Sequence, residues 1–297
     1  MQKLISKAFS FLDHRGMFDF LDDKLYLELS YRAVFGKKLD LVNPKTYSEK
    51  LQWLKLYDHR PEYSSMVDKY EVKRYVSERI GAEHVIPTLG VWDSFDQIDF
   101  SLLPNQFVLK CTHDSGGLVI CKDKESFDVR KAENKIRKSL QHNYFLSGRE
   151  WPYKNVKPRI LAETYMEDPE DMELRDYKFF AFDGEVKALF IATDRGDQSK
   201  ETKFDFFDAD FVHLPLTNGH PNAQKCPHKP ACFDEMKHYA SLLSKDIPQA
   251  RIDFYEVRGK VYFGEITFFH WSGFKPFDPP EWDLRFGEWI KLPEQRV

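Results

Sequence analysis

The stretch RIDFYEVRGKVYFGEITF, residues 251–268, decides the fold. Two runs rich in β-branched and aromatic residues flank Gly259, a pattern typical of two strands joined by a turn. A second hairpin is predicted around Asp183-Gly184, and helical patterns occur elsewhere in the chain. Mixed helices and hairpins favour an α+β protein with mainly antiparallel sheets.

Four polar side chains of the 251–268 hairpin are predicted to meet. Because side chains alternate between faces, Arg251 and Asp253 share a face of the first strand, and Glu265 and Thr267 share one of the second. A hairpin centred on Gly259 sets Asp253 opposite Glu265 and Arg251 opposite Thr267. Facing carboxylates repel, which indicates a protonated acid or a cation such as Mg²⁺ between them. Two solvated acids on an exposed hairpin are the alternative.

A second motif lies between two further predicted strands, 106–111 and 118–122. The intervening Ser115-Gly116-Gly117 has glycines whose backbone can approach a phosphate closely, and Lys110 supplies a positive charge just before them. Strands on both sides exclude the strand–loop–helix of a Walker loop. An ordinary hairpin loop is the alternative.

A third motif is the predicted strand 159–166, which contains Glu163 and Tyr165 and runs into an acidic stretch, residues 167–171. Such a strand end can offer backbone groups to a base and carboxylates to ribose hydroxyls. The acidic stretch by itself is also what a solvated loop looks like.

The remaining pattern predicts several other elements. Residues 1–40 are expected to be helical, with Leu25, Leu29 and Val34 at helical spacing, and a capping box at Thr46 and Glu49 opens another helix. Further helices are predicted at 64–80, 130–140 and 233–245, and further strands at 176–182, 185–193, 251–257 and 260–269.

Composition excludes several classes of protein. Of 297 residues, 42% are hydrophobic and 31% charged, and the net charge is −4, which predicts no nucleic-acid partner. No apolar run reaches membrane-spanning length, and the N-terminus lacks a signal-peptide pattern. Four cysteines without a disulfide framework favour the cytoplasm.

Two features of the composition keep alternatives open. The 15% aromatic content, with 26 Phe, fits either a Phe-rich core or a sugar-stacking surface. Cys226, His228 and Cys232 lie near His220 in a Pro-rich stretch and are either zinc ligands or part of a plain surface loop.

The motifs together resemble the TupA-like ATP-grasp family, named for teichuronopeptide biosynthesis and associated with surface polysaccharides. The resemblance runs from about residue 43 to 292. It is carried by Asn43 to Leu51, Asp68-Lys69, Phe107 to Lys110, His113 to Gly117, Glu163, Asp176 to Phe179, Arg251 to Tyr255 and Gly264 to Phe268.

The resemblance implies an ATP-grasp fold, in which two α+β lobes with mainly antiparallel sheets clasp ATP. Residues 1–62 would form an N-terminal helical region, 63–162 the small lobe with the glycine-rich phosphate loop, and 163–297 the large lobe with the metal site. It also implies roles for particular residues. ATP would be bound by Lys69, Lys110, His113, Ser115, Gly116, Gly117, Glu163, Tyr165, Lys178 and Asp171 or Asp168. Arg251 and Lys178 would be catalytic. Asp253, Glu265 and Thr267 would hold Mg²⁺, for which Mn²⁺ can substitute, with Thr267 standing where many ATP-grasp enzymes carry Asn.

The activity implied is that of a bacterial carboxylate–amine ligase that forms an amide through an acyl-phosphate, with ADP and phosphate as products. A surface-polysaccharide or capsule setting implies a hexuronic acid, or another carboxylate, and an amino acid or amine as substrates. A glycosyltransferase or polysaccharide kinase is the alternative, although the one D-x-D, Asp208-Ala209-Asp210, has the composition of a turn.

Overall fold

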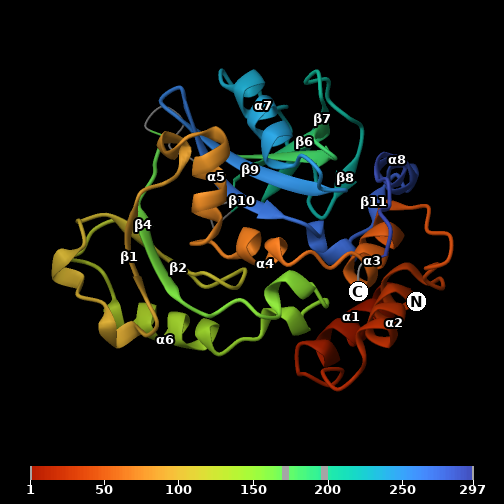
Figure 1. The fold of residues 1–297 in the computed structure, drawn as a ribbon, viewed down its shortest axis with the longest axis horizontal. Helices are drawn as coiled ribbons and strands as arrows, with labels where there is room; N and C mark the ends of the chain where they lie inside the picture. Colours follow the sequence, from red (N-terminus) through yellow and green to blue (C-terminus); the bar gives the residue numbers. More distant parts are fainter. Residues whose placement is uncertain (1, 169–173, 195–199, 296–297) are drawn as a thin grey trace.

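The computed structural model describes residues 2–168, 174–194 and 200–295. Two antiparallel sheets dominate it, a larger one under α7 and a smaller one beside α6, and helices α1 and α2 lie at the end of the molecule away from the small sheet (Figure 1). None of the helices in the described part of the chain has the length and apolar character needed to span a membrane. The α+β expectation is confirmed.

The larger sheet has the strand order β10-β9-β5-β6-β7. It consists of β5 (Asp176–Phe182), β6 (Glu185–Thr193), β7 (Lys203–Asp208), β9 (Ala250–Val257) and β10 (Lys260–Thr267). The Asp183-Gly184 turn is confirmed, with both residues at positive φ, as a two-residue hairpin turn requires. A two-stranded sheet of β8 (Thr217–Asn218) and β11 (Phe277–Asp278) is formed separately.

The β9–β10 hairpin has the predicted residue pairs, but it forms them through a bulge and not through a regular ladder. The turn is Arg258-Gly259, with Val257 opposite Lys260, so a regular ladder would set Asp253 opposite Gly264. A bulge between Phe263 and Glu265 restores the predicted pairs, Glu265 with Asp253 and Thr267 with Arg251. A Cβ on Gly264 would lie 3.1 Å from the Asp253 carbonyl oxygen, closer than ordinary van der Waals contact, so a larger residue here would press on the Asp253 backbone.

The smaller sheet has the order β1-β4-β2-β3, with β1 (Thr88–Trp92), β2 (Phe107–Cys111), β3 (Leu118–Cys121) and β4 (Ile160–Thr164). Its own apolar core includes Phe107, Leu109 and Ile160 and is closed by Ala132 and Ile136 of α6 (Val129–Leu140). The β2–β3 hairpin carries the glycine loop at its tip, with Lys110 opposite Leu118.

Helices fill the space around the larger sheet. These are α3 (Tyr47–Tyr57), α4 (Glu62–Val67), α5 (Val72–Ile80), α7 (Phe233–Leu243) and α8 (Glu281–Trp289). The Thr46–Glu49 capping box is confirmed. The single helix predicted at 64–80 is wrong: Asp68 interrupts it, because its carboxylate accepts the backbone N–H groups of Tyr70 and Glu71.

Two expectations about packing have different outcomes. The Phe-rich core is confirmed, since Phe179, Phe180, Phe190, Phe206 and Phe254 are almost completely buried in the larger sheet. On α2 (Asp23–Phe35), which pairs with α1 (Gln2–Asp13), Leu25 and Leu29 are instead exposed. The buried face is formed by Tyr26, Leu27 and Tyr31.

Candidate active site

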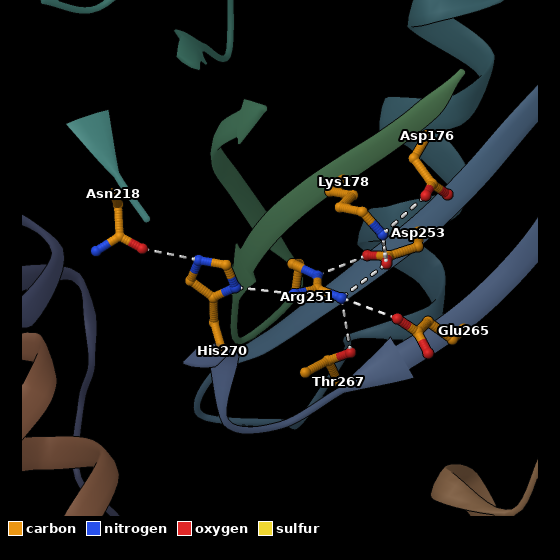
Figure 2. Close-up of polar contacts among 8 residues, drawn as sticks. All are labelled: Asp176, Lys178, Asn218, Arg251, Asp253, Glu265, Thr267 and His270. Carbon is orange, nitrogen blue, oxygen red and sulfur yellow. Dashed lines mark hydrogen bonds and ion pairs between the residues drawn. The ribbon is translucent and has the colours of Figure 1, made fainter. Parts of the chain in front are cut away.

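Arg251 is the centre of a buried polar cluster on β5, β9 and β10. Its Nε lies 2.7 Å from Asp253 Oδ1 and its Nη2 2.8 Å from Oδ2, a bidentate pair (Figure 2). The same Nη2 lies 2.9 Å from Glu265 Oε1 and 3.0 Å from Thr267 Oγ1. The guanidinium therefore joins all the hairpin residues that the sequence placed together.

Lys178 adds a second cation. Its Nζ contacts Asp253 Oδ2 and lies 3.4 Å from Asp176 Oδ2, and it is itself buried. Burial lowers the pKa of Lys178, and the Asp253 carboxylate opposes that shift. Burial acts to raise the pKa of Asp253, but Arg251 and Lys178 outweigh it and hold that pKa well below its usual range.

The position of the Arg251 guanidinium changes the interpretation of the two facing carboxylates. The facing carboxylates of Asp253 and Glu265 do not need a metal ion to relieve their repulsion, because the Arg251 guanidinium lies between them. Among the described residues, no three His, Cys, Asp or Glu side chains come together as a metal site. A Mg²⁺ ion at this place would need ligands from elsewhere, such as substrate phosphates.

His270 and Asn218 belong to the cluster and were missed from the sequence. Arg251 Nη1 donates to His270 Nδ1 at 2.8 Å, and His270 Nε2 lies 3.1 Å from Asn218 Oδ1. Because arginine can only donate, Nδ1 is the acceptor and Nε2 carries the proton. Burial and then Arg251 lower the pKa of His270, so the ring is neutral at physiological pH. His270 lies directly after the predicted strand 260–269, but its type and spacing gave no sign of this role.

Hydrogen bonds around Asp114 fix the conformation of the glycine hairpin. Asp114 Oδ1 accepts the backbone N–H of Gly117, Ser139 donates to the other Asp114 oxygen, and Lys69 Nζ contacts the Asp114 carbonyl oxygen. A Cβ on Gly117 would overlap Ser139, so this glycine serves close packing inside the loop. Gly116, at φ +141°, is exposed at the tip, where a Cβ would meet no described atom within 4 Å.

The other predicted loop residues divide between interior and surface. His113 is buried, with its Nε2 3.2 Å from the carbonyl oxygen of His142, whereas Ser115 is exposed. Burial raises the pKa of Tyr144, and hydrogen bonding to Ser115 acts in the opposite direction. The loop thus presents Ser115 and Gly116 outward.

Lys110 is part of a cluster of ion pairs. Its Nζ lies 2.6 Å from Glu163 Oε2, and Lys73 of α5 contacts Glu163 Oε1. Burial acts to raise the pKa of Glu163, but Lys110 and Lys73 lower it, so this carboxylate is charged. Lys73 was missed, although it follows Lys69 at the helical spacing of four residues. Glu163 thereby faces the two lysines, which fixes the position of Lys110.

The predicted adenine and ribose contacts lie at the end of β4. Tyr165 is half-buried, with the Lys122 ammonium 5.7 Å from its ring centroid. Asp168 follows in the loop, and Asp171 lies outside the described residues. No contact among the described residues tests the role of these side chains toward a nucleotide.

Lys69 interacts with groups of both parts of the site. Burial lowers the pKa of Lys69, and the charges of Glu265 and then Asp114 oppose that shift. Lys69 thus contacts the glycine hairpin through the Asp114 carbonyl oxygen and interacts electrostatically with Glu265 of the Arg251 cluster. Its backbone N–H also donates to the Thr112 carbonyl oxygen at 3.1 Å. The site thus combines cations and loop backbone at the glycine hairpin with paired acids and a guanidinium on the larger sheet.

This combination of lysines, glycine hairpin, acids and arginine agrees with the family comparison. The sequence matches the family model described as TupA-like ATPgrasp over residues 49–291. The chain belongs to the TupA-like ATP-grasp family. Its two antiparallel sheets are those of the ATP-grasp fold, and the resemblance based on the motifs is confirmed.

Among solved structures, this TupA-like chain is similar to several ligases. The D-alanine–D-alanine ligase of Bacillus anthracis complexed with ATP is 15% identical, with a TM-score of 0.39 over 68% of this chain and 54% of the ligase. The Helicobacter pylori ligase is 15% identical, with a TM-score of 0.41 over 77% and 61%. The ATP-grasp ligase PsnB with its minimal precursor is 10% identical, with a TM-score of 0.41 over 70% and 53%. The chain thus spans less than two thirds of each of these proteins. No curated protein matches it by sequence.

Two other motifs of the TupA-like chain lie outside the cluster. Asp208 Oδ1 accepts the backbone N–H groups of Asp210 and Val212, so the D-x-D is a turn at the end of β7. Cys226 is exposed while Cys232 is buried at the start of α7, and no described metal cluster includes them. The surface-loop interpretation of this stretch therefore fits better than zinc.

Proposed function

We propose that this TupA-like protein is an ATP-dependent carboxylate–amine ligase that joins an amino acid or another amine to a hexuronic acid of a cell-surface polysaccharide. The carboxylate of the acid attacks the γ-phosphorus of ATP, and ADP leaves with the electrons of the broken phosphoanhydride bond. The amine then attacks the acyl carbon and expels phosphate, which carries away one oxygen of the original carboxylate.

The observation that carries the proposal is the position of the Arg251 guanidinium. It is fixed by Asp253 and His270, and it reaches Glu265 and Thr267. A planar fork held in this way matches the oxygens of a transferring phosphoryl group. Lysines alone would serve nucleotide binding, whereas a preorganised arginine supports stabilisation of transferred charge.

The lysines and the glycine hairpin support the placement of ATP. Lys110, oriented by Glu163, and Lys69, anchored on Asp114, provide two positive charges beside a hairpin whose tip is glycine. Backbone N–H groups at Ser115 and Gly116 are suited to hold phosphate oxygens. Tyr165 with Asp168 or Asp171 would take the base and the ribose, and Lys178 would contact phosphate only after leaving its carboxylate partners.

The donor set fits Mg²⁺ in part. Asp253 and Glu265 offer the hard oxygens that Mg²⁺ prefers, and the Glu265 side chain is 44% exposed, toward the place proposed for phosphates. Glu265 and Asp253 would hold the ion, with Thr267 as an orienting hydroxyl. When bound, Mg²⁺ or Mn²⁺ would neutralise the phosphate oxygens. Arg251 already contacts both acids, so the ion and the guanidinium would share them.

A screen of ADP release tests the proposal. Uronic acids, free and as methyl glycosides, are combined with amino acids in the presence of ATP and Mg²⁺. We expect ADP release that requires both an acid and an amine, with the amide detected by mass spectrometry. ADP release with a saccharide alone, accompanied by a phosphorylated sugar, would instead indicate a polysaccharide kinase. Sugar transfer from a nucleotide sugar without ATP would indicate a glycosyltransferase.

A further inference from the structure

The segment directly after His270 adopts an unusual backbone. Trp271, Ser272 and Gly273 have φ values of +49°, +54° and +66°, so three consecutive residues are left-handed. L-residues other than glycine rarely adopt this conformation, because it puts Cβ too close to the following carbonyl oxygen. Two such residues in a row persist only where the surroundings hold them, and strain of this kind concentrates at functional sites.

Side chains of α3 hold this left-handed turn in place. Gln52 Nε2 donates to the carbonyl oxygens of Ser272 and Gly273 at 3.1 and 3.3 Å. Lys55 Nζ lies 2.8 Å from both the carbonyl oxygen and the hydroxyl of Ser272 and 2.7 Å from the Gly148 carbonyl oxygen. Lys55 is buried, so these contacts are protected from water. These hydrogen bonds therefore hold the turn in its left-handed conformation.

This turn presents a large aromatic side chain to solvent. Trp271 is 43% exposed, although burial would be the usual outcome for an indole next to a Phe-rich core. Its ring rests on the backbone of Gly219, where a Cβ would come within 2.9 Å of the indole, and its centroid lies 6.3 Å from that of Phe204. Gly219 is thus required for the indole to take this position.

An aromatic floor connects Trp271 to the proposed reaction centre. Phe204 packs on Phe190 at 4.4 Å between centroids, and Arg251 lies 5.8 Å from the Phe190 centroid. His270, the residue before Trp271, accepts a hydrogen bond from Arg251, as Figure 2 shows. Trp271 therefore lies on the same face of the larger sheet as the guanidinium.

A cation accompanies the exposed ring. Lys275 Nζ lies 5.8 Å from the Trp271 centroid. The backbone of Lys275 is fixed as well, because Asn218 Nδ2 donates to its carbonyl oxygen at 3.0 Å while Asn218 Oδ1 bonds to His270. One asparagine thus ties the segment that carries Lys275 to the segment that positions Arg251.

We propose that Trp271 and Lys275 form an acceptor subsite for an acidic sugar ring next to the one that reacts. The apolar C–H face of a pyranose fits the electron-rich face of the indole, and Lys275 pairs with the sugar carboxylate. The subsite rests on the proposed ligase function, which needs a hexuronic acid near Arg251. It makes the preferred substrate an oligomer of acidic sugars rather than a single uronic acid.

Direct binding tests the subsite without turnover. Calorimetry compares wild type with Trp271→Asn, chosen because Asn tolerates the left-handed backbone, using digalacturonate, methyl galacturonide and neutral lactose as probes. We expect digalacturonate to bind wild type at least about 10-fold more tightly than the other two probes. Trp271→Asn should lose most of that preference, Trp271→Phe should keep it, and Lys275→Gln should weaken digalacturonate about 3-fold in a salt-dependent way.

Controls separate this inference from the ligase proposal. Leu102→Asn changes a side chain that is 82% exposed on the smaller lobe and should leave digalacturonate binding unchanged. Equal digalacturonate affinity in wild type and Trp271→Asn, with unchanged thermal stability, would overturn the subsite. Weaker binding of an ATP analogue by Trp271→Asn would also overturn it and assign the indole to the nucleotide. Either result leaves ADP release from an acid and an amine intact.

Discussion

At the scale of single residues, Asp253 is the group on which the cluster depends. Its side chain is completely buried and both oxygens are bonded to cations. Replacing it with Asn leaves Arg251 and Lys178 without their charge partner, so we expect Asp253→Asn to cost about 3–5 kcal/mol of unfolding free energy. Urea denaturation at pH 7 measures this cost.

Glu265→Gln is the matched control, because Glu265 is nearly half exposed and shares only one arginine nitrogen. We expect a loss of about 1 kcal/mol or less. The Asp253 contribution should also depend on pH. Its pKa is lowered on folding, so its stabilisation is full above the unfolded value of 3.8 and is lost as the pH falls below that value. Equal stability of Asp253→Asn and wild type at pH 7 would show that the cluster is not a paired unit.

Arg251→Lys probes the guanidinium itself. A lysine keeps the charge but cannot span Asp253 and reach Glu265, Thr267 and His270 together. We expect kcat for ADP release to fall by at least about 100-fold, with the Kd of an ATP analogue changed less than about 3-fold. Steady-state kinetics and calorimetry measure the two quantities. Near-normal turnover would place Arg251 in a purely structural role.

At the scale of elements, the β9–β10 bulge sets the chemistry. Gly264→Val brings a branched side chain against the Asp253 backbone and should remove the bulge or distort it. We expect about 1–3 kcal/mol of lost stability, and loss of ADP release beyond what that instability explains. Gly259→Asn is the control, since Asn tolerates the positive φ and open space surrounds that position. Normal activity of Gly264→Val would show that the register is held by something other than the bulge.

The same hairpin shows what alternation in a sequence can predict. The faces of Arg251, Asp253, Glu265 and Thr267 follow from the two-residue period, and these residues do meet. The predicted strand ends also leave residues 258 and 259 for the turn, as observed, but the bulge at Gly264 that produces these pairs from that turn did not follow from the pattern. The break at Asp68 was missed for a similar reason: a side chain that bonds to the following N–H groups competes with an otherwise regular helical pattern.

At the scale of the whole molecule, the site is formed by segments far apart in the sequence. His270, Asn218 and Trp271 take part only because the tertiary fold brings them there, so no local period could reveal them. The motifs that could be predicted, Lys110 with the glycine hairpin and the β9–β10 residues, each occupy one hairpin. Their order along the chain indicated the family, which the family model confirms over residues 49–291.

Lys69, which contacts the glycine hairpin and interacts electrostatically with Glu265, leads to a prediction about nucleotide binding. A non-hydrolysable ATP analogue with Mg²⁺ should bridge the glycine hairpin and the Arg251 cluster, and hydrogen exchange across residues 112–118 should slow at least about 5-fold. Residues 23–35 of α2 serve as an internal control, because their buried face belongs to a separate apolar cluster. Unchanged exchange in 112–118 with the analogue bound would remove the hairpin from the ATP site.

The most direct test of the ligase account follows the carboxylate oxygen. An acid that supports amine-dependent ADP release is prepared with ¹⁸O in its carboxylate, and the released phosphate is analysed by mass spectrometry. Activation as an acyl-phosphate transfers one carboxylate oxygen to phosphorus. We therefore expect one ¹⁸O in each phosphate released and one retained in the amide. Amide formed from the labelled acid together with phosphate that carries no ¹⁸O would contradict the account.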